Sequence, residues 1–162
     1  MKLMNFSIYI FILLTGLAFT NTTLGADRHS GYYYPPPKQI EIYKARAKTL
    51  LNTNRSRRIE FVTAITFQRL KRPYPPPTIF FAKGEQAQKF IIVALQDGPL
   101  DTIYRVRAYL ASLTATARTT PIFQELDMDE NFTFFDLAKM LGFEQITVSD
   151  GKSFTHQVKF EE

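Results

Sequence analysis

The first 26 residues constrain the fold most, because they have the three-part layout of a secretory signal peptide. A short basic start, Met1-Lys2, precedes an uncharged apolar run from Phe6 to Phe19, and small or polar residues follow up to Ala26. We expect cleavage after Gly25 or Ala26, which removes the leader from the folded protein. A membrane-spanning helix needs about 18 or more apolar residues. The run is shorter than this, so we favour a cleaved leader over a retained anchor.

The segment from Asp27 to Glu162 is long enough for one domain with one hydrophobic core. The sequence has no cysteine, so we expect the core alone to stabilise an exported domain, and a thiolate metal site is excluded. This composition favours a bacterial periplasm over a disulfide-rich extracellular module. The 20 Lys and Arg against 15 Asp and Glu are spread along the chain. A mild, dispersed positive charge does not predict nucleic-acid binding.

Residues 27–57 are predicted to form an arm followed by a helix. The arm contains Tyr32, Tyr33, Tyr34, Pro35, Pro36 and Pro37, a run that cannot be helical and favours polyproline II. From Lys38 to Leu51 the apolar residues recur at helical spacing, which predicts an amphipathic helix.

Residues 58–162 are predicted to form an α+β domain. We expect a single small domain with a four- or five-stranded antiparallel or mixed sheet and two or three helices packed on one face. The expected strands are 59–62, 78–82, 89–95, which should be buried on both faces, and the two strands of a hairpin over 144–160 with a type I′ turn at Asp150-Gly151. The expected helices are 63–71, 102–118 with Asp101 as N-cap, and 134–141 between a Thr133/Asp136 capping box and Gly142.

Two Tyr-Pro-Pro-Pro stretches, Tyr34–Pro37 and Tyr74–Pro77, are the candidate binding elements. Preformed polyproline segments bind aromatic-lined grooves at a low entropic cost. The alternative is that each stretch is a rigid connector whose tyrosine packs on the domain. We therefore predict partner binding by the residues Tyr32, Tyr33, Tyr34, Pro35, Pro36, Pro37 and Tyr74.

Other motifs predict neither catalytic residues, nor a cofactor, nor a metal site. Asp127, Asp129 and Asn131 open like a calcium-binding loop, but Phe132 stands where that loop needs glycine. His156 alternates with apolar residues, which is typical of a strand, and no hydrolytic motif accompanies it. The basic residues Arg55, Arg57, Arg58, Arg69, Lys71 and Arg72 could contact anionic lipid or an acidic partner, or form a solvated surface.

Three stretches carry a family resemblance: RPYPPPTIFFAKGEQAQKFIIVAL, LTATARTTPIF and FTFFDLAKMLGFEQITVSDG. They resemble a family of small exported alphaproteobacterial proteins without an established activity, some of which carry a label as molybdopterin-guanine dinucleotide biosynthesis protein A. This chain lacks the glycine-rich nucleotide loop that such an activity requires. The resemblance therefore implies an address in the bacterial envelope and no catalytic residue.

These observations lead to three hypotheses. The first is a non-catalytic exported protein, resident in the periplasm, that binds an unidentified protein partner and touches the membrane at most peripherally. The second is a secreted effector of a host-associated bacterium. The third is a small periplasmic hydrolase or ligand-binding protein centred on His156.

Overall fold

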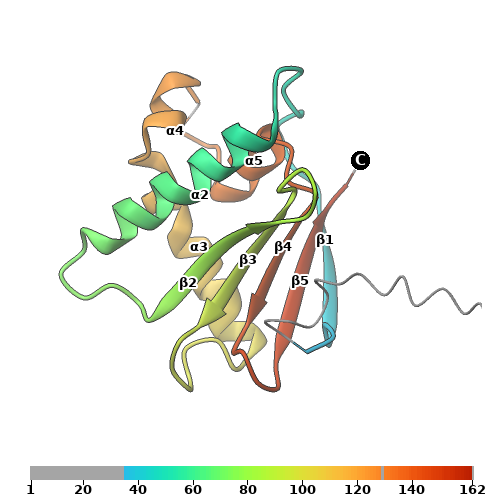
Figure 1. Cartoon of the computed structure of the whole chain (residues 1–162), viewed down its shortest axis with the longest axis vertical. Coiled ribbons are helices and arrows are strands. Elements are labelled where there is room, and N and C mark those ends of the chain that lie inside the picture. The colour runs from blue at the N-terminus through green and yellow to red at the C-terminus, as the bar shows by residue number, and fades with distance from the viewer. Residues whose placement is uncertain (1–34, 129, 162) are drawn as a thin grey trace, which may run out of the picture. The chain divides into compact units, whose positions relative to one another are not determined.

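The computed structural model describes residues 35–128 and 130–161, which belong to one compact unit. The five strands are β1 (Gln39–Tyr43), β2 (Thr78–Lys83), β3 (Lys89–Ala94), β4 (Gln145–Ser149) and β5 (Thr155–Phe160). The helices are α2 (Arg55–Leu70), α3 (Ile103–Arg118), α4 (Pro121–Glu125) and α5 (Phe134–Met140). Figure 1 shows the helices beside one five-stranded sheet. The predicted α+β class is confirmed, with one helix more than expected.

The sheet is mixed and has the order β1-β5-β4-β3-β2. The β2–β3 and β4–β5 pairs are antiparallel, whereas β3–β4 and β1–β5 are parallel. Because side chains alternate along a strand, each register row lies on one face. The row Phe80, Ile92, Val148 and His156 faces the helices, and the row Phe81, Ile91, Thr147 and Gln157 faces the other way.

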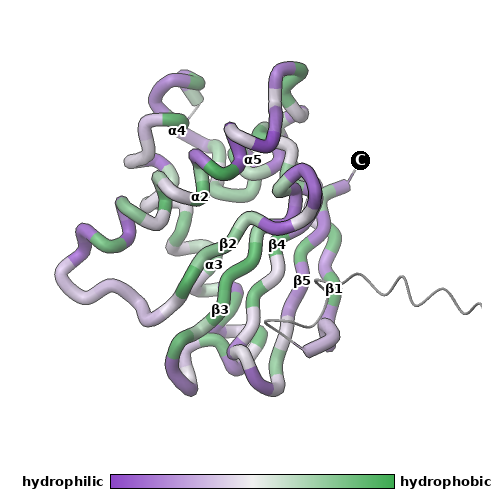
Figure 2. The backbone as a smooth tube through the Cα atoms, in the orientation of Figure 1, coloured by the Kyte–Doolittle hydropathy of each residue, from purple (hydrophilic) through white to green (hydrophobic). Residues whose placement is uncertain are grey.

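The hydrophobic core lies between the sheet and the helices, and all four helices contribute buried side chains to it. Four fully buried phenylalanines form its centre, with neighbouring ring centroids 5.5–6.2 Å apart: Phe61, Phe90, Phe134 and Phe143. Such tilted and edge-on ring pairs stabilise a core beyond their buried area. Strand β3 is apolar along most of its length (Figure 2). Its prediction as a strand buried on both faces is confirmed.

The predicted helix over 38–51 is wrong, because Gln39–Tyr43 forms the edge strand β1. The backbone N–H of Lys38 donates to the carbonyl oxygen of Thr155 at 3.0 Å and starts the pairing with β5. Local spacing favoured a helix, but a strand at this place satisfies the outer backbone groups of β5. The chain from Lys44 to Asn54 is irregular.

The predicted strand over 59–62 is also wrong, because α2 begins at Arg55. The side chain of Asn54 caps the helix by accepting a hydrogen bond from the N–H of Arg57 at 2.9 Å. An N-terminal cap supports a helix through exactly the residues whose alternation resembled a strand. The buried positions of α2 follow helical spacing: Arg58, Phe61, Val62, Ile65 and Arg69.

Helix α5 has both of its predicted end signals. The hydroxyl of Thr133 accepts from the N–H of Asp136, whose carboxylate accepts from the N–H of Thr133 at 2.9 Å. Gly142 has a φ of 78°, and the N–H of Phe143 donates to the carbonyl of Ala138 at 3.0 Å. These bonds complete the capping box and a Schellman stop.

Two other predicted boundaries need correction. Helix α3 is confirmed, but Thr102 rather than Asp101 is its N-cap. The hairpin of β4 and β5 is confirmed, but five residues, 150–154, connect its strands instead of a two-residue turn. The additional helix α4 begins at Pro121, where a missing N–H costs nothing.

The hairpin loop is closed by Asp150, whose carboxylate accepts from the N–H groups of Lys152, Ser153 and Phe154 at 2.8–2.9 Å. Burial alone raises the pKa of a carboxyl group, but these donors outweigh it and lower the pKa of Asp150. The aspartate thus organises the turn through its side chain, and type I′ backbone geometry is not needed.

Candidate functional site

The loop between α2 and β2, residues 71–77, contains the second Tyr-Pro-Pro-Pro stretch. The buried side chain of Arg69, near the end of α2, anchors this loop by hydrogen bonds. This side chain is 5% exposed. Its guanidinium donates to the carbonyl oxygen of Pro76 at 3.1 Å and also bonds to Thr78, and it lies 4.6 Å from the ring centroid of Phe80. A buried arginine that bridges the loop to the core restrains both ends of the proline run.

Two further hydrogen bonds join the base of this loop to α3. The hydroxyl oxygens of Tyr109 and Thr78 are 2.7 Å apart, and Arg72 donates to the hydroxyl of Thr116 at 2.6 Å. Burial raises the pKa of Tyr109, so its phenol stays protonated at neutral pH. The loop is therefore a preformed feature of the domain.

Above this base, the outer side of the loop and of α2 is apolar and exposed. Tyr74 is 94% exposed, Phe67 is 60% exposed and Leu70 is 56% exposed. Leu95 is exposed beside the end of the loop, where its N–H donates to the carbonyl of Pro77 at 2.7 Å. Exposed apolar side chains on the end of one helix, the loop that follows it and the residue bonded to the end of that loop indicate a candidate interaction surface. We call it the α2–β2 surface and define it by Phe67, Leu70, Lys71, Tyr74 and Leu95.

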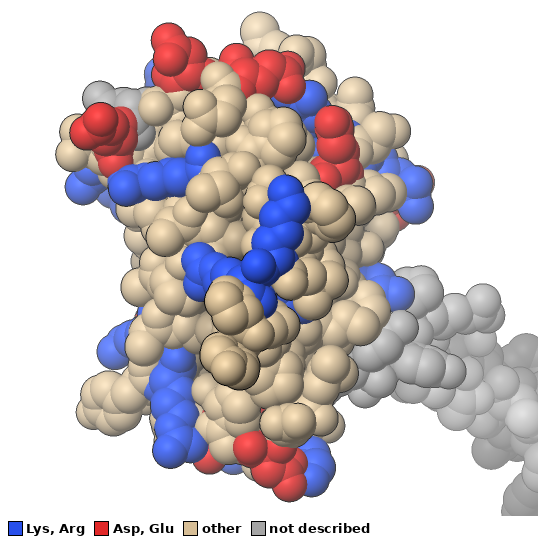
Figure 3. Space-filling view, turned by 90° about the vertical axis from the view of Figure 1, so that its left-hand side faces the viewer, with Lys and Arg blue, Asp and Glu red and all other residues tan. Residues whose placement is uncertain are grey.

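The charge on this part of the chain has one sign. The sequence has no acidic residue between Glu60 and Glu85, whereas Arg69, Lys71, Arg72 and Lys83 lie within that stretch. The ammonium group of Lys71 lies 4.6 Å from the ring centroid of Phe67. In Figure 3, Lys and Arg side chains lie amid uncharged ones at the centre of this side of the molecule, and the acidic side chains gather towards its top and bottom.

Among the predicted binding residues that the structure describes, Pro35–Pro37 lie next to β1 and Tyr74 lies next to β2, at opposite edges of the sheet. Tyr32, Tyr33 and Tyr34 lie outside the described residues. Pro35 and Pro37 are half-buried and Pro36 is exposed, next to the start of β1. Tyr74 belongs to the α2–β2 surface and lies on the loop that follows α2, distant in sequence from the first proline run.

Sequence reasoning missed Phe67, Leu70 and Leu95 as surface residues. The available signal was helical phase: Phe61, Ile65 and Arg69 share one stripe, which leaves Phe67 and Leu70 on another side of α2. That phase could be read only after the whole segment had been assigned to a helix.

The six predicted basic residues do not form one surface cluster. Arg58 is 6% exposed, and its guanidinium donates to the carbonyls of Gln86 at 2.7 Å and Leu141 at 3.1 Å. Arg57 forms ion pairs with Glu60 and Glu125. Arg58 and Arg69 therefore hold the fold, Arg57 lies in partly exposed ion pairs, and Lys71 remains the exposed cation of the α2–β2 surface.

His156 is buried in β5 on the helix-facing side of the sheet, with no exposed area. Its Nε2 is 3.4 Å from Oε2 of Glu41, and Glu41 also pairs with Arg107 of α3. Burial lowers the pKa of His156, although the Glu41 carboxylate opposes the shift. A general base must reach its substrate, so this burial does not favour a hydrolase centred on His156.

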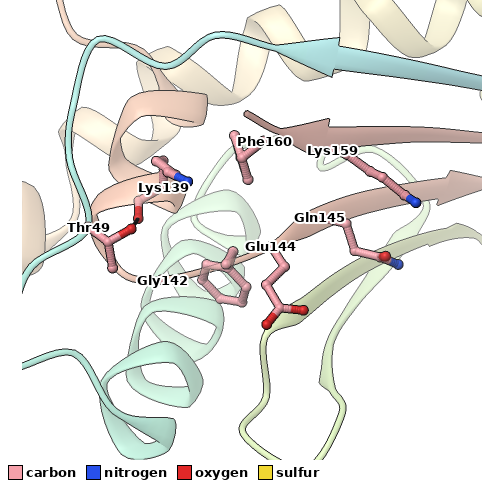
Figure 4. Close-up of a pocket in the computed structure, with 8 residues that line it drawn as sticks. Thr49, Lys139, Gly142, Glu144, Gln145, Lys159 and Phe160 are labelled. Atoms are coloured by element: carbon pink, nitrogen blue, oxygen red, sulfur yellow. Dashed lines mark hydrogen bonds between the residues drawn. The ribbon is translucent and has the colours of Figure 1, made fainter. Parts of the chain in front are cut away.

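A hollow of about 440 Å³ lies where the end of α5 meets β4 and β5 (Figure 4). Lys139, Glu144 and Lys159 are its charged lining residues. The ammonium of Lys139 donates to the carbonyl of Glu161 at 2.8 Å, and Figure 4 shows Lys159 extending away from Lys139. The charged groups do not converge on one point, so the hollow lacks the geometry of a general acid–base pair.

In residues 35–128 and 130–161, no group of three His, Asp or Glu side chains could hold a metal ion, and Asp129 of the calcium-like loop lies outside them. No helix in the same residues is long and apolar enough to cross a membrane.

Comparison of the chain with protein-family models, with curated proteins and with solved structures finds no match. The resemblance to exported alphaproteobacterial proteins therefore stays a prediction.

Proposed function

We propose that this chain is an exported, non-catalytic binding protein that docks an acidic protein partner on the α2–β2 surface. The observation that supports this most directly is Tyr74, which is 94% exposed on a loop anchored by a buried arginine. An aromatic ring that a restrained loop keeps exposed to water has an unfavourable hydration free energy and does not stabilise the domain. A partner that buries this ring removes that cost and gains a rigid anchor of the kind found at binding hot spots.

The chemistry of the surface favours a protein as the occupant. Tyr74 and Pro75 are exposed neighbours in the loop, and aromatic-lined grooves bind such proline-rich segments. Phe67 and Leu70 extend the apolar area over about one turn of α2. The acid-free stretch with Lys71 then selects a groove with an acidic rim, because opposite charges steer encounter and determine orientation.

The test is site-specific photo-crosslinking in cells that export the chain. A photoreactive residue replaces Tyr74, and the matched control replaces Tyr104, which is 79% exposed on α3. We expect one discrete crosslinked protein from position 74 and none of that mass from position 104. Identical crosslinks from both positions would show non-specific contact and contradict the proposal.

A charge variant tests the acidic character of the partner. We expect Lys71→Glu to reduce the crosslink at position 74 several-fold, because it places like charge against the partner. The control is Lys48→Glu, an exposed lysine in the irregular segment before α2. If crosslinking fails but the purified chain sediments with anionic vesicles, a membrane rather than a protein is the occupant.

Fractionation distinguishes the two destinations that the leader allows. A crosslinked protein recovered from the periplasm supports a resident binding protein of the envelope. Recovery of the chain in the medium, with the crosslink formed only after host material is added, supports a secreted effector.

A further inference from the structure

Strand β2 is an edge of the sheet, and among the described residues no strand lies on its outer side. Its pairing with β3 is continuous over all six residues, from Thr78 opposite Ala94 to Lys83 opposite Lys89, without a bulge. In an antiparallel pair, residues whose N–H and C=O groups both bond to the neighbouring strand alternate with residues whose groups both point away from it. The register therefore shows which backbone groups of β2 point outward.

The bond between Leu95 and Pro77 determines this alternation. The N–H of Leu95 donates to the carbonyl of Pro77 at 2.7 Å, and these residues continue the register of the two strands. The odd-numbered positions from 77 to 83 therefore bond towards β3. The backbone groups of Thr78, Phe80 and Ala82 then point to the outer edge.

The contacts of Thr78 agree with this assignment. Its N–H donates to the carbonyl of Pro76 at 2.8 Å, and its carbonyl accepts from Arg69, so both groups bond outside the sheet. Within residues 35–128 and 130–161, no such bond engages the outward groups of Phe80 and Ala82. We call these two residues, with the neighbouring Ile79, the β2 edge. Two N–H and two C=O groups in a row are a template for a further strand.

The β2 edge lacks the features that usually prevent such pairing. The first five residues of β2, Thr78–Ala82, contain neither a proline nor a charged residue. The other edge strand, β1, has Glu41 at its centre, and the Glu41 carboxylate pairs with Arg107 on the helix side of the sheet. A charge that points inward on an edge strand opposes the addition of another strand. The side chain of Ile79, on the face away from the helices, is 38% exposed and offers apolar contact to an added strand.

The charge around the β2 edge indicates an acidic occupant. The sequence between Glu60 and Glu85 contains basic residues and no acidic ones. Figure 3 views the molecule from the side on which β2 is the outermost strand in Figure 1, and Lys and Arg side chains lie at its centre. A second copy of the chain paired through β2 would place these cations against their own counterparts, which like-charge repulsion opposes. An acidic segment is attracted to the same place.

The β2 edge is continuous with the α2–β2 surface. The loop that carries Tyr74 leads directly into β2, and the buried Arg69 bonds to both Pro76 and Thr78 at the junction. We propose that the acidic partner adds an extended segment to the sheet as a further strand, paired with the backbone of Phe80 and Ala82. This inference rests on the proposed function, because it names the way in which the same partner is held.

Amide hydrogen exchange tests the β2 edge without the partner. In the purified chain we expect the amides of Phe80 and Ala82 to exchange at least about tenfold faster than those of Ile79 and Phe81, which bond to β3. Equal protection of all four amides would show that the chain itself covers the edge, and it would overturn the proposal.

Photo-crosslinking tests whether the partner lies along β2. A photoreactive residue replaces Ile79, and the matched control replaces Ile42, which is 67% exposed on the other edge strand. We expect position 79 to give the same crosslinked protein as position 74, and position 42 to give none of it. A product made of two copies of the chain would identify a second copy as the occupant and overturn the proposal.

The two positions also separate this inference from the proposed function. A protein crosslinked from position 74 but not from position 79 would leave the α2–β2 surface as the docking site and reject the added strand. A protein crosslinked from position 79 alone would support the strand and reject docking on the α2–β2 surface. The absence of any crosslink from either position would reject both.

A proline substitution tests the backbone pairing itself. Ala82→Pro removes one outward N–H, and an edge strand tolerates proline where that group points away from the sheet. Ala82→Val keeps the N–H and adds a side chain of similar size. We expect Ala82→Pro to reduce the crosslink at position 74 several-fold relative to Ala82→Val, at similar melting temperatures. Equal yields would reject the pairing.

A second measurement decides the case in which Ala82→Pro does not fold. The native chain is then mixed with the purified protein that was crosslinked from position 79. We expect the amides of Phe80 and Ala82 to exchange about tenfold more slowly in this complex than in the free chain, because the added strand accepts their hydrogen bonds. Unchanged exchange at both amides would reject the added strand.

Discussion

At the scale of single residues, three buried polar side chains explain features that hydrophobicity does not. Arg58 and Arg69 are cations that compensate for burial by donating to carbonyl oxygens, Arg58 at the end of α5 and Arg69 at the proline loop. His156 forms no such hydrogen bond with the described residues through either ring nitrogen, and the Glu41 carboxylate, 3.4 Å from Nε2, only partly offsets its burial. Its neutral form is therefore the one that the fold accommodates.

His156 makes the stability of the domain depend on pH. Burial lowers its pKa in the folded state, so the unfolded chain binds the proton more readily. The contribution of neutral His156 to the free energy of unfolding is fully present above the ordinary pKa of about 6.5. It decreases as the pH falls below that value, by at most about 1.4 kcal/mol per pH unit. We expect the melting temperature of His156→Gln to change less between pH 7 and pH 5 than that of the native chain.

Glu41→Gln serves as the partner variant for this prediction. The Glu41 carboxylate opposes the lowering of the pKa of His156, so its removal should steepen the loss of stability on acidification. Equal pH dependence in the native chain and in His156→Gln would show that another group is responsible.

At the scale of elements, the two ends of α5 were predicted correctly, whereas the identity of two other elements was not. Thr133, Asp136 and Gly142 specify α5 through local hydrogen bonds, which sequence spacing is enough to identify. The predicted helix over 38–51 and the predicted strand over 59–62 both failed, because short apolar runs fit either period and the neighbouring strand or cap decides. Helix α5 also forms a hydrogen bond to a segment that is distant in the sequence, the irregular chain before α2.

Asp136 extends the capping box into a tertiary link. Its carboxylate accepts from the backbone N–H of Arg46 at 2.7 Å, in addition to the bonds with Thr133. We expect Asp136→Ala to lower the free energy of unfolding by about 2 kcal/mol, since it leaves the part-buried donors of Arg46 and Thr133 without a partner. Urea denaturation measures the loss. The control Thr102→Ala removes only the exposed cap of α3 and should cost about 1 kcal/mol.

At the scale of the whole molecule, the fold depends on contacts between segments that are distant in the chain. The parallel pairs β1–β5 and β3–β4 join strands more than 50 residues apart. Arg58 links α2 to the 84–88 loop through Gln86 and to the end of α5 through Leu141 and Gly142. It is thus a junction of three segments.

The neighbouring arginines of α2 allow a matched test of this junction. Arg58→Leu leaves the carbonyls of Gln86 and Leu141 without their donor, and we expect it to destabilise the domain by about 3 kcal/mol. Arg57→Leu removes only partly exposed ion pairs and should cost less than about 1 kcal/mol. Thermal or urea unfolding of both variants gives the comparison, and similar losses would refute the junction.

The candidate site was predictable in part. Tyr74 was identified from its proline context, because consecutive prolines prevent helix and strand wherever they occur. The exposure of Phe67 and Leu70 was not, since it depends on the phase of α2 against β2. The burial of Arg69 was hidden as well, because a basic residue is normally exposed and its acceptors come from Pro76 of the loop and Thr78 of β2.

The sequence by itself determined the α+β class, strands β2 to β5, α3, and both ends of α5, because these follow from local periodicity, capping and turn chemistry. Only the tertiary structure decided that Gln39–Tyr43 is a strand, that α2 begins at Arg55, and that Tyr74, Phe67 and Leu70 are exposed. These outcomes depend on backbone partners and packing neighbours that come from elsewhere in the chain, and no local window of residues contains them.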